Sequence, residues 1–135
     1  MGMTDMRQRT ALDLPVEEWK TYRPVPAILQ RQSAIQSQLE RRRKRGMRLA
    51  RQAAALLRKE FGARRVVLFG SLASHSGFTL WSDIDLAVFE VPADRFYAAV
   101  AAITGLSAEF KVDLVDAEAC KAALRAAIDR DGIAL

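Results

Sequence analysis

The sequence predicts a small α/β domain in which helices pack on one face of a mixed β-sheet. Three apolar runs of strand length, near residues 64–69, 84–91 and 109–115, predict the strands. Helical periodicity before the first run and after the other two predicts the helices. The length of 135 residues, of which 50% are hydrophobic, suits one domain with a modest core.

The N-terminal part of the chain is predicted to be an extension, residues 1–32, which precedes a domain of residues 33–135. The extension shows little sustained periodicity and contains several prolines, so a long helix is not expected there. These prolines are Pro15, Pro24 and Pro26. Trp19 and Tyr22 give the extension two aromatic side chains, which would dock on the domain itself or on a partner.

A helix is predicted from about Ser33 to Phe61, with a break near Gly46. Apolar side chains recur at helical spacing in its second half and would face the core. They are Leu49, Ala53, Leu56 and Leu57. Gly62 is expected to cap the helix, because glycine readily adopts the left-handed conformation that ends many helices. The first strand follows directly.

The rest of the domain alternates strands and helices. A segment rich in serine and glycine, residues 70–82, is expected to be a loop or a short helix after the first strand. The second strand is followed by a helix from Pro92 to about Gly105. After the third strand, Asp116 is expected to cap a last helix. The apolar positions of this helix are Cys120, Leu124 and Ile128.

The charge and the cysteine content of the chain limit the kinds of partner and of cellular compartment that are expected. The net charge of +5 indicates an affinity for anions such as nucleic acid, nucleotide phosphates or an acidic protein surface. The single cysteine, Cys120, excludes an internal disulfide and fits a reducing compartment. No apolar stretch approaches the length of a membrane span, and the first fifteen residues lack the apolar core of a signal peptide. A cytoplasmic location without membrane contact is expected.

Three aspartates interrupt the apolar runs. Asp83 and Asp85 stand at the start of the second strand, and Asp113 lies within the third. Because side chains alternate along a strand, Asp83 and Asp85 would share one face, and Asp113 would oppose its neighbours Val112 and Leu114. Each carboxylate alone also fits a polar strand edge or an open sheet face. Three carboxylates that meet repel one another unless a cation neutralises them, so the pattern favours a divalent-metal site for phosphoryl or nucleotidyl transfer.

A glycine and a serine follow the first strand. Gly70 permits a tight turn and the close approach of a phosphate to the backbone. Ser71 would add a hydroxyl donor, and a helix that begins here would add free N–H groups. By itself, a Gly-Ser pair after a strand is usually only a turn, so its meaning depends on the aspartates.

Together these motifs resemble the nucleotidyltransferase superfamily that includes DNA polymerase β, and within it the minimal nucleotidyltransferases (MNT). The family signature is a Gly-Ser after the first strand, an Asp-x-Asp on the second and a third acid on a later strand. Gly70-Ser71, Asp83-Ile84-Asp85 and Asp113 match these places. The resemblance covers roughly residues 45–135 and implies the polymerase β-like nucleotidyltransferase fold.

The resemblance implies a Mg²⁺-dependent enzyme that moves a nucleoside monophosphate, in the first instance AMP from ATP, onto a hydroxyl group. Gly70 and Ser71 would hold the triphosphate. Asp83 and Asp85 would bind the metal ions. Asp113 would complete the second metal site and help to deprotonate the acceptor hydroxyl.

One part of the family pattern differs in this chain. Many members continue Gly-Ser-x-Ala-Arg-Gly, where the arginine helps to hold the triphosphate. Here Ser74 stands in the place of the arginine, and the spacing to Asp83 is somewhat longer than is common. His75 would either donate to a phosphate in its stead or be an ordinary exposed histidine of the loop.

The resemblance also implies a partner. MNT proteins of this size are typically paired with a small helical HEPN-family protein, in many pairs a ribonuclease toxin, and some modify a tyrosine of it. The expected role is therefore the antitoxin of a toxin–antitoxin pair, acting by AMPylation. The alternative is a non-catalytic antitoxin module that binds a nucleotide or the partner and acts by occlusion, which the missing arginine favours.

The predicted helix carries a basic cluster. Seven arginines and lysines fall within eleven residues: Arg41, Arg42, Arg43, Lys44, Arg45, Arg48 and Arg51. On a helix they would cover most of the circumference, which suits a polyanion or an acidic protein surface, and a solvated helix is the alternative. No interleaved aromatic residues or nucleic-acid-reading motif accompany the cluster, so nucleic-acid binding through Arg41–Arg51 is not favoured.

Overall fold

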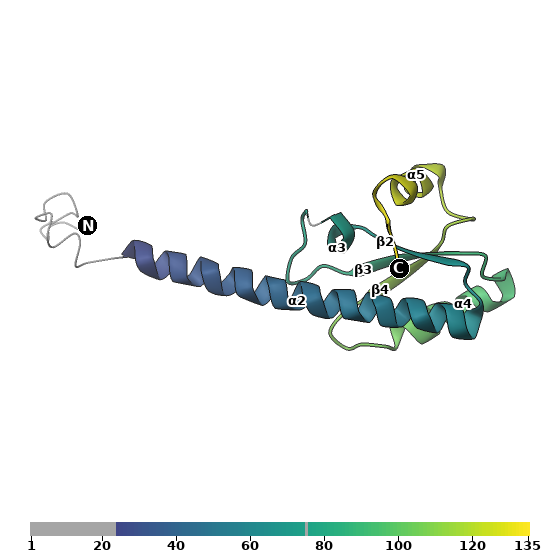
Figure 1. The fold of residues 1–135 in the computed structure, drawn as a ribbon, viewed down its shortest axis with the longest axis horizontal. Coiled ribbons are helices and arrows are strands. Elements are labelled where there is room, and N and C mark those ends of the chain that lie inside the picture. The colour runs from purple at the N-terminus through teal and green to yellow at the C-terminus, as the bar shows by residue number, and fades with distance from the viewer. Residues whose placement is uncertain (1–23, 75) are drawn as a thin grey trace, which may run out of the picture. The chain divides into compact units, whose positions relative to one another are not determined.

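The computed structural model describes residues 24–74 and 76–135, which form four helices and four strands (Figure 1). The helices are α2 (Pro24–Phe61), α3 (Ser71–Ser74), α4 (Ala93–Thr104) and α5 (Ala122–Asp131). The strands are β2 (Arg65–Phe69), β3 (Ile84–Phe89), β4 (Val112–Asp116) and β5 (Ile133–Ala134). Trp19 and Tyr22, with their predicted docking role, and His75 lie outside the described residues.

The strands form one mixed sheet in the order β4-β3-β2-β5. Strand β2 runs antiparallel to both β3 and β5, whereas β3 and β4 are parallel. This mixed sheet with its helices confirms the predicted fold class. The sequence did not predict β5, because two residues are too few to show a period.

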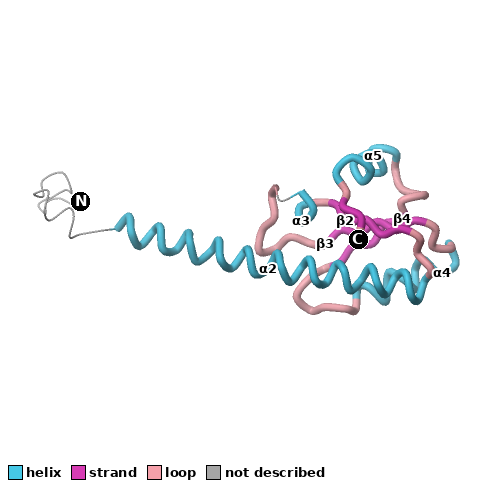
Figure 2. Tube along the Cα trace, in the orientation of Figure 1, coloured by secondary structure: helices cyan, strands magenta, loops and turns pink. Residues whose placement is uncertain are grey.

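Helices cover both faces of the sheet (Figures 1 and 2). Helices α2 and α4 pack on the face that presents Val66 and Leu86. Helix α5 covers the opposite face, where Ile128 packs with Val67 and Ala87. The predicted packing on one face therefore describes α2 and α4, and α5 adds a second layer. Strands β2 and β3 are apolar without interruption over most of their length, which is typical of strands buried on both faces.

Helix α2 begins earlier than predicted and is not broken at Gly46. Pro24 and Pro26 lie in its first turn, where the missing N–H of proline has no intrahelical partner to lose, so the expectation that they prevent a helix is wrong. Gly46 is buried, and a Cβ on it would lie 3.2 Å from Leu72 Cδ2 and 3.4 Å from Phe110 Cζ. The glycine thus serves close packing, not a break in the helix.

Helix α4 runs between Pro92 and Gly105, as predicted. Helix α5 begins at Ala122, which is later than predicted, because Asp116 caps a turn after β4 instead of the helix. The Asp116 Oδ1 accepts a hydrogen bond of 2.9 Å from the N–H of Glu118. Cys120 therefore precedes α5, although it still packs half-buried against the second core.

All four strands belong to a compact unit of residues 39–135. The predicted domain boundary between residues 32 and 33 falls inside α2 and stays a prediction. Within the part of the chain that the structure describes, no helix has both the length and the hydropathy needed to cross a membrane.

Candidate active site

Asp85 and Asp113 are direct neighbours on β3 and β4. The two parallel strands pair in a register that places Asp85 opposite Asp113. Their side chains therefore lie on the same face of the sheet, which further along β3 also presents Ala87 to the core beneath α5. Ile84 and Leu86 pack on the opposite face, with α2 and α4. The structure thus shows the alternation that the sequence pattern indicates.

Asp83 lies just before β3, which begins at Ile84. It is half-buried, and it is close enough to Asp85 for its charge to act on that carboxyl group. The antiparallel strand β2 ends at the same place, since Phe69 pairs with Asp85. The three predicted carboxylates therefore gather at one end of the sheet, where β2 ends and β3 and β4 begin.

The electrostatics of this end are unfavourable without a cation. Burial raises the pKa of the Asp85 carboxyl, the negative charges of Asp113 and Asp83 raise it further, and Lys111 acts in the opposite direction. Lys111 Nζ lies 3.8 Å from Asp113 Oδ1; the lysine side chain is largely exposed and that of Asp113 about half exposed, so solvent weakens this pair. Lys111 thus offsets only part of the repulsion among the carboxylates, and a further cation would relieve the rest.

Gly70 leaves the space that the Asp85 carboxylate occupies. It directly follows β2 and has a φ of +78°, a conformation that only glycine adopts without strain. A Cβ on Gly70 would overlap with Asp85 Oδ2 and would lie 3.2 Å from its Cγ. The sequence pattern assigned Gly70 to a phosphate, and the structure places it against one of the acids.

Helix α3 follows Gly70 and is a single turn. It begins at the half-buried Ser71 and is anchored by the buried side chains of Leu72 and Ala73. Ser74 ends the turn, and its Oγ accepts a hydrogen bond of 3.2 Å from the N–H of Ser76. The residue in the place of the family's arginine is thus engaged within its own loop.

One cleft borders the carboxylates, and another borders the turn that follows β2. One, of about 510 Å³, is lined by Asp85, Lys111 and Asp113 together with apolar side chains from β4, α4 and α5. The other, of about 230 Å³, is lined by Gly70 and Asp131 among others. A ligand therefore has space beside the acids and beside the turn that follows β2.

The carboxylate oxygens of the site fit a Mg²⁺ ion whose remaining ligands come from the substrate. Asp85 and Asp113 offer adjacent carboxylate oxygens, which are the ligands this ion prefers. In the described ranges 24–74 and 76–135, no group of three His, Cys, Asp or Glu side chains is placed so that it could hold a metal ion by itself. Mg²⁺ usually keeps several waters and binds through one or two carboxylates plus substrate phosphates, so an open pair suffices.

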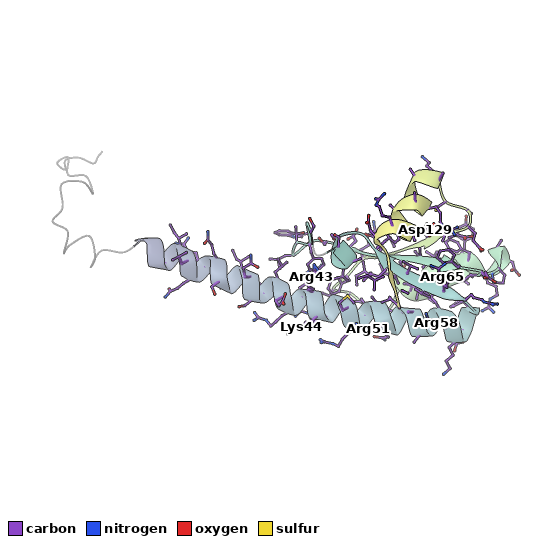
Figure 3. All side chains as sticks on the ribbon, turned by 45° about the horizontal axis from the view of Figure 1, so that its top comes forward. Arg43, Lys44, Arg51, Arg58, Arg65 and Asp129 are labelled. Carbon is purple, nitrogen blue, oxygen red and sulfur yellow. The ribbon has the colours of Figure 1, made fainter. Side chains whose placement is uncertain are left out.

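The structure divides the basic cluster into inward and outward members. Arg42 is buried, Arg43 donates to the Leu72 carbonyl at 2.9 Å, and Arg45 binds Glu109. Arg45 is nevertheless exposed, as are Arg41, Lys44, Arg48 and Arg51. Figure 3 shows Lys44 and Arg51 on the side of α2 that faces away from the sheet. The prediction that exposed basic side chains cover most of the helix circumference is therefore wrong, because Arg42 and Arg43 bind within the domain.

Sequence reasoning missed two residues near the carboxylates. Lys111 stands two positions before Asp113, a spacing that places both on one face of an extended segment, so this signal was available. The burial of Arg42 could not be predicted, because a run of similar basic residues does not show which of them is buried.

Comparison with known proteins identifies the family. No curated protein matches the sequence. Residues 51–135 match the profile of the family described as "Polymerase beta, Nucleotidyltransferase". This segment covers more than half of the chain and includes Gly70, Ser71 and the three aspartates. The superfamily indicated by the motifs is thus confirmed, and the chain belongs to the polymerase β nucleotidyltransferase family.

Proposed function

We propose that this protein is a minimal nucleotidyltransferase that transfers AMP from ATP to a hydroxyl group of a partner protein. Family membership supports nucleotidyl transfer as the type of reaction. The pairing of Asp85 with Asp113 carries the proposal, because it provides adjacent oxygen ligands at the end of the sheet where Gly70 lies. The raised pKa of Asp85 agrees with a site that needs a cation.

The proposed mechanism gives each motif a role. Asp83, Asp85 and Asp113 would hold Mg²⁺, and Gly70 and Ser71 would hold the triphosphate. Bound Mg²⁺ supplies positive charge to the in-line displacement at the α-phosphorus. The acceptor oxygen forms a bond to that phosphorus, the bond to the bridging oxygen breaks, and pyrophosphate leaves with the electron pair. Asp113 accepts the proton of the acceptor hydroxyl.

The partner is proposed to be a HEPN-family helical protein, with this chain as the antitoxin of the pair. Resemblance of the motifs to MNT proteins supports this assignment. The unit of residues 39–135 also consists of the sheet and its covering helices, without a separate acceptor-binding domain in that range. The partner would thus supply its own acceptor hydroxyl. A cytoplasmic location stays a prediction.

A second candidate is an antitoxin module that acts by occlusion without catalysis. The observation that favours it is Ser74, which replaces the arginine of the family motif and forms hydrogen bonds within its own loop. A site without that cation would hold a triphosphate less tightly. The two candidates differ in whether the carboxylates are needed to neutralise the partner.

The experiment combines the purified protein with the candidate partner encoded by the neighbouring gene, ATP and Mg²⁺, and measures the mass of the partner. The wild-type protein should add AMP to the partner and suppress its toxicity. The double variant Asp83→Asn, Asp85→Asn should lose both effects. Glu40→Gln, which removes an exposed carboxylate from α2, is the matched control and should retain both.

Each outcome separates the candidates. A double variant that still neutralises the partner, without any gain in mass, would favour occlusion. An unmodified partner after incubation with wild-type protein that binds Mg²⁺ would count against the transferase.

A further inference from the structure

Arg42 is the buried member of the basic cluster. The residue is 8% exposed, and it is the one charged residue that is buried among those the structure describes. A buried guanidinium loses its hydration, and this loss is tolerable only where protein groups replace the water. The partners of Arg42 therefore indicate what its burial achieves.

These partners lie in the two segments that lead into β3 and β4. The Arg42 Nη2 donates to the Ser82 carbonyl at 3.1 Å, directly before the first carboxylate of the site. Its Nη1 donates to Glu109 Oε2 at 3.4 Å, and its guanidinium lies 4.0 Å from the centroid of the Phe110 ring. One side chain of α2 thus binds the chain just before each of the two parallel strands.

A backbone contact joins the same two segments beside Arg42. The N–H of Ile84 donates to the Lys111 carbonyl at 3.0 Å, where the parallel pairing of β3 and β4 begins. Asp83 lies one residue before this contact, and Asp113 lies two residues after Lys111. The distance between these two carboxylates therefore depends on how the segments are held at this end.

Arg42 holds this position although one of its own donors is unpaired. Its Nε is buried and has no hydrogen-bond partner in the described part of the chain. An unpaired buried donor lowers the stability of the folded state, because it has given up its hydrogen bonds to water. Where a buried charge serves only stability, an apolar residue often replaces it without loss. The incomplete pairing thus favours a role for Arg42 in holding the two segments, beyond stability alone.

Arg45 keeps Glu109 available to Arg42. The Arg45 Nε and Nη2 donate to the Glu109 carboxylate at 3.0 Å and 2.6 Å. This hydrogen bonding holds the pKa of Glu109 below its usual range, so the carboxylate is ionised at neutral pH. The second partner of Arg42 is thus itself fixed to α2.

We propose that Arg42 is a positioning residue, which sets the spacing between the segments of Asp83 and Asp113 and thereby the metal affinity of the site. This inference rests on the proposed function, since it concerns the same carboxylates. Arg42 binds the segments and supplies no metal ligand. Its substitution should therefore weaken metal binding while all three carboxylates remain in the chain.

The test compares three variants of the full chain. Arg42→Met keeps a long stem that packs on Phe110 and removes the hydrogen bonds. Arg42→Lys keeps the charge and one donor group. Arg41→Gln is the matched control, because it changes an exposed neighbour on the same helix. Circular dichroism establishes that each variant is folded.

Two measurements report on the site without catalysis. Electron paramagnetic resonance measures the affinity for Mn²⁺ in the absence of nucleotide. Fluorescence anisotropy measures the rotational freedom of Trp81, which is 83% exposed and precedes Ser82, in a Trp19→Phe background. Arg42→Met should weaken Mn²⁺ binding about tenfold, as is typical when groups that orient metal ligands are lost, and should lower the anisotropy. Arg42→Lys should give intermediate values, and Arg41→Gln should behave as the wild type.

Wild-type Mn²⁺ affinity together with wild-type Trp81 anisotropy in Arg42→Met would overturn the positioning role. Wild-type protein that binds no Mn²⁺ would instead contradict the proposed metal-dependent transfer, and the anisotropy would still decide whether Arg42 holds the segment. If Arg42→Met does not fold, Arg42→Lys provides the same comparison. Lysine retains the charge but cannot donate to the Ser82 carbonyl and the Glu109 carboxylate as the two ends of the guanidinium do.

Discussion

Gly70 and Gly77 share nearly the same backbone conformation, with φ of +78° and +77°, but only Gly70 touches a carboxylate. A Cβ on Gly70 would overlap with Asp85, whereas none of the described residues lies within 4 Å of a Cβ on Gly77. Alanine at either position carries the same backbone strain. The two substitutions therefore separate the cost of strain from the cost of displacing Asp85.

Gly77→Ala should lower the free energy of unfolding by about 1–2 kcal/mol through left-handed strain alone, with Mn²⁺ affinity unchanged. Gly70→Ala should cost at least as much stability. It should also reduce nucleotidyl transfer by about a hundredfold, because it moves a proposed metal ligand. Urea unfolding measures the stability of both variants, an assay of AMP transfer measures the activity, and Mn²⁺ titration measures whether the metal site has changed. Wild-type metal affinity in Gly70→Ala would show that Asp85 is not a ligand.

The pKa of Asp85 predicts a dependence of stability on pH. Because the folded pKa is raised, the folded state binds more protons than the unfolded state between the ordinary aspartate pKa, about 3.9, and the raised value. Stability is therefore lost as the pH rises through this window. At neutral pH and without metal, Asp85→Asn should be more stable than the wild type, and the difference should vanish below the window.

Urea unfolding at a series of pH values in EDTA measures this effect. Glu40→Gln, which removes an exposed acid in the middle of α2, should show no such difference. An Asp85→Asn variant that is less stable than the wild type at neutral pH would mean that the Asp85 charge is stabilised in the folded protein.

Helix α2 illustrates how packing overrides local propensity. A glycine inside a helix costs about 1 kcal/mol relative to alanine, and on that ground the sequence predicted a break at Gly46. The helix continues because Gly46 lets α2 approach Leu72 and Phe110 closely. Leu72 belongs to α3 and Phe110 precedes β4, so this contact fixes α2 against both sides of the site.

Gly46→Leu should lower the free energy of unfolding by about 1–3 kcal/mol, because the side chain has no space between α2 and its neighbours. Gln52→Leu, at an exposed position of the same helix, should leave stability nearly unchanged. Thermal and urea unfolding measure both variants. A more stable Gly46→Leu protein would show that the space beside Gly46 is larger than the 3.2 Å contact indicates.

For the domain as a whole, metal binding should increase the stability of the folded protein. A ligand that binds only the folded state raises the free energy of unfolding, by about 2.7 kcal/mol at a hundred times its Kd. Mg²⁺ should therefore raise the melting temperature of the wild type. Asp113→Asn, which removes one of the paired carboxylates, should lose most of this gain.

Differential scanning fluorimetry with and without Mg²⁺ measures the shift, and NaCl of equal ionic strength controls for screening of charge. An equal shift in Asp113→Asn and wild type would place the metal elsewhere in the chain. No shift in either protein would count against the metal-dependent transferase and would favour the occlusion candidate.

The sequence by itself determined the strands that carry the site and the side of each strand on which Asp85 and Asp113 lie, because alternation is a local property of an extended chain. It also determined that Gly70 follows the first of them. Only the tertiary structure decided that the two aspartates stand in register, that α5 covers the second face of the sheet and that Arg42 is buried among exposed basic residues. These features depend on which distant segments pack together, and no local period of the sequence records that choice.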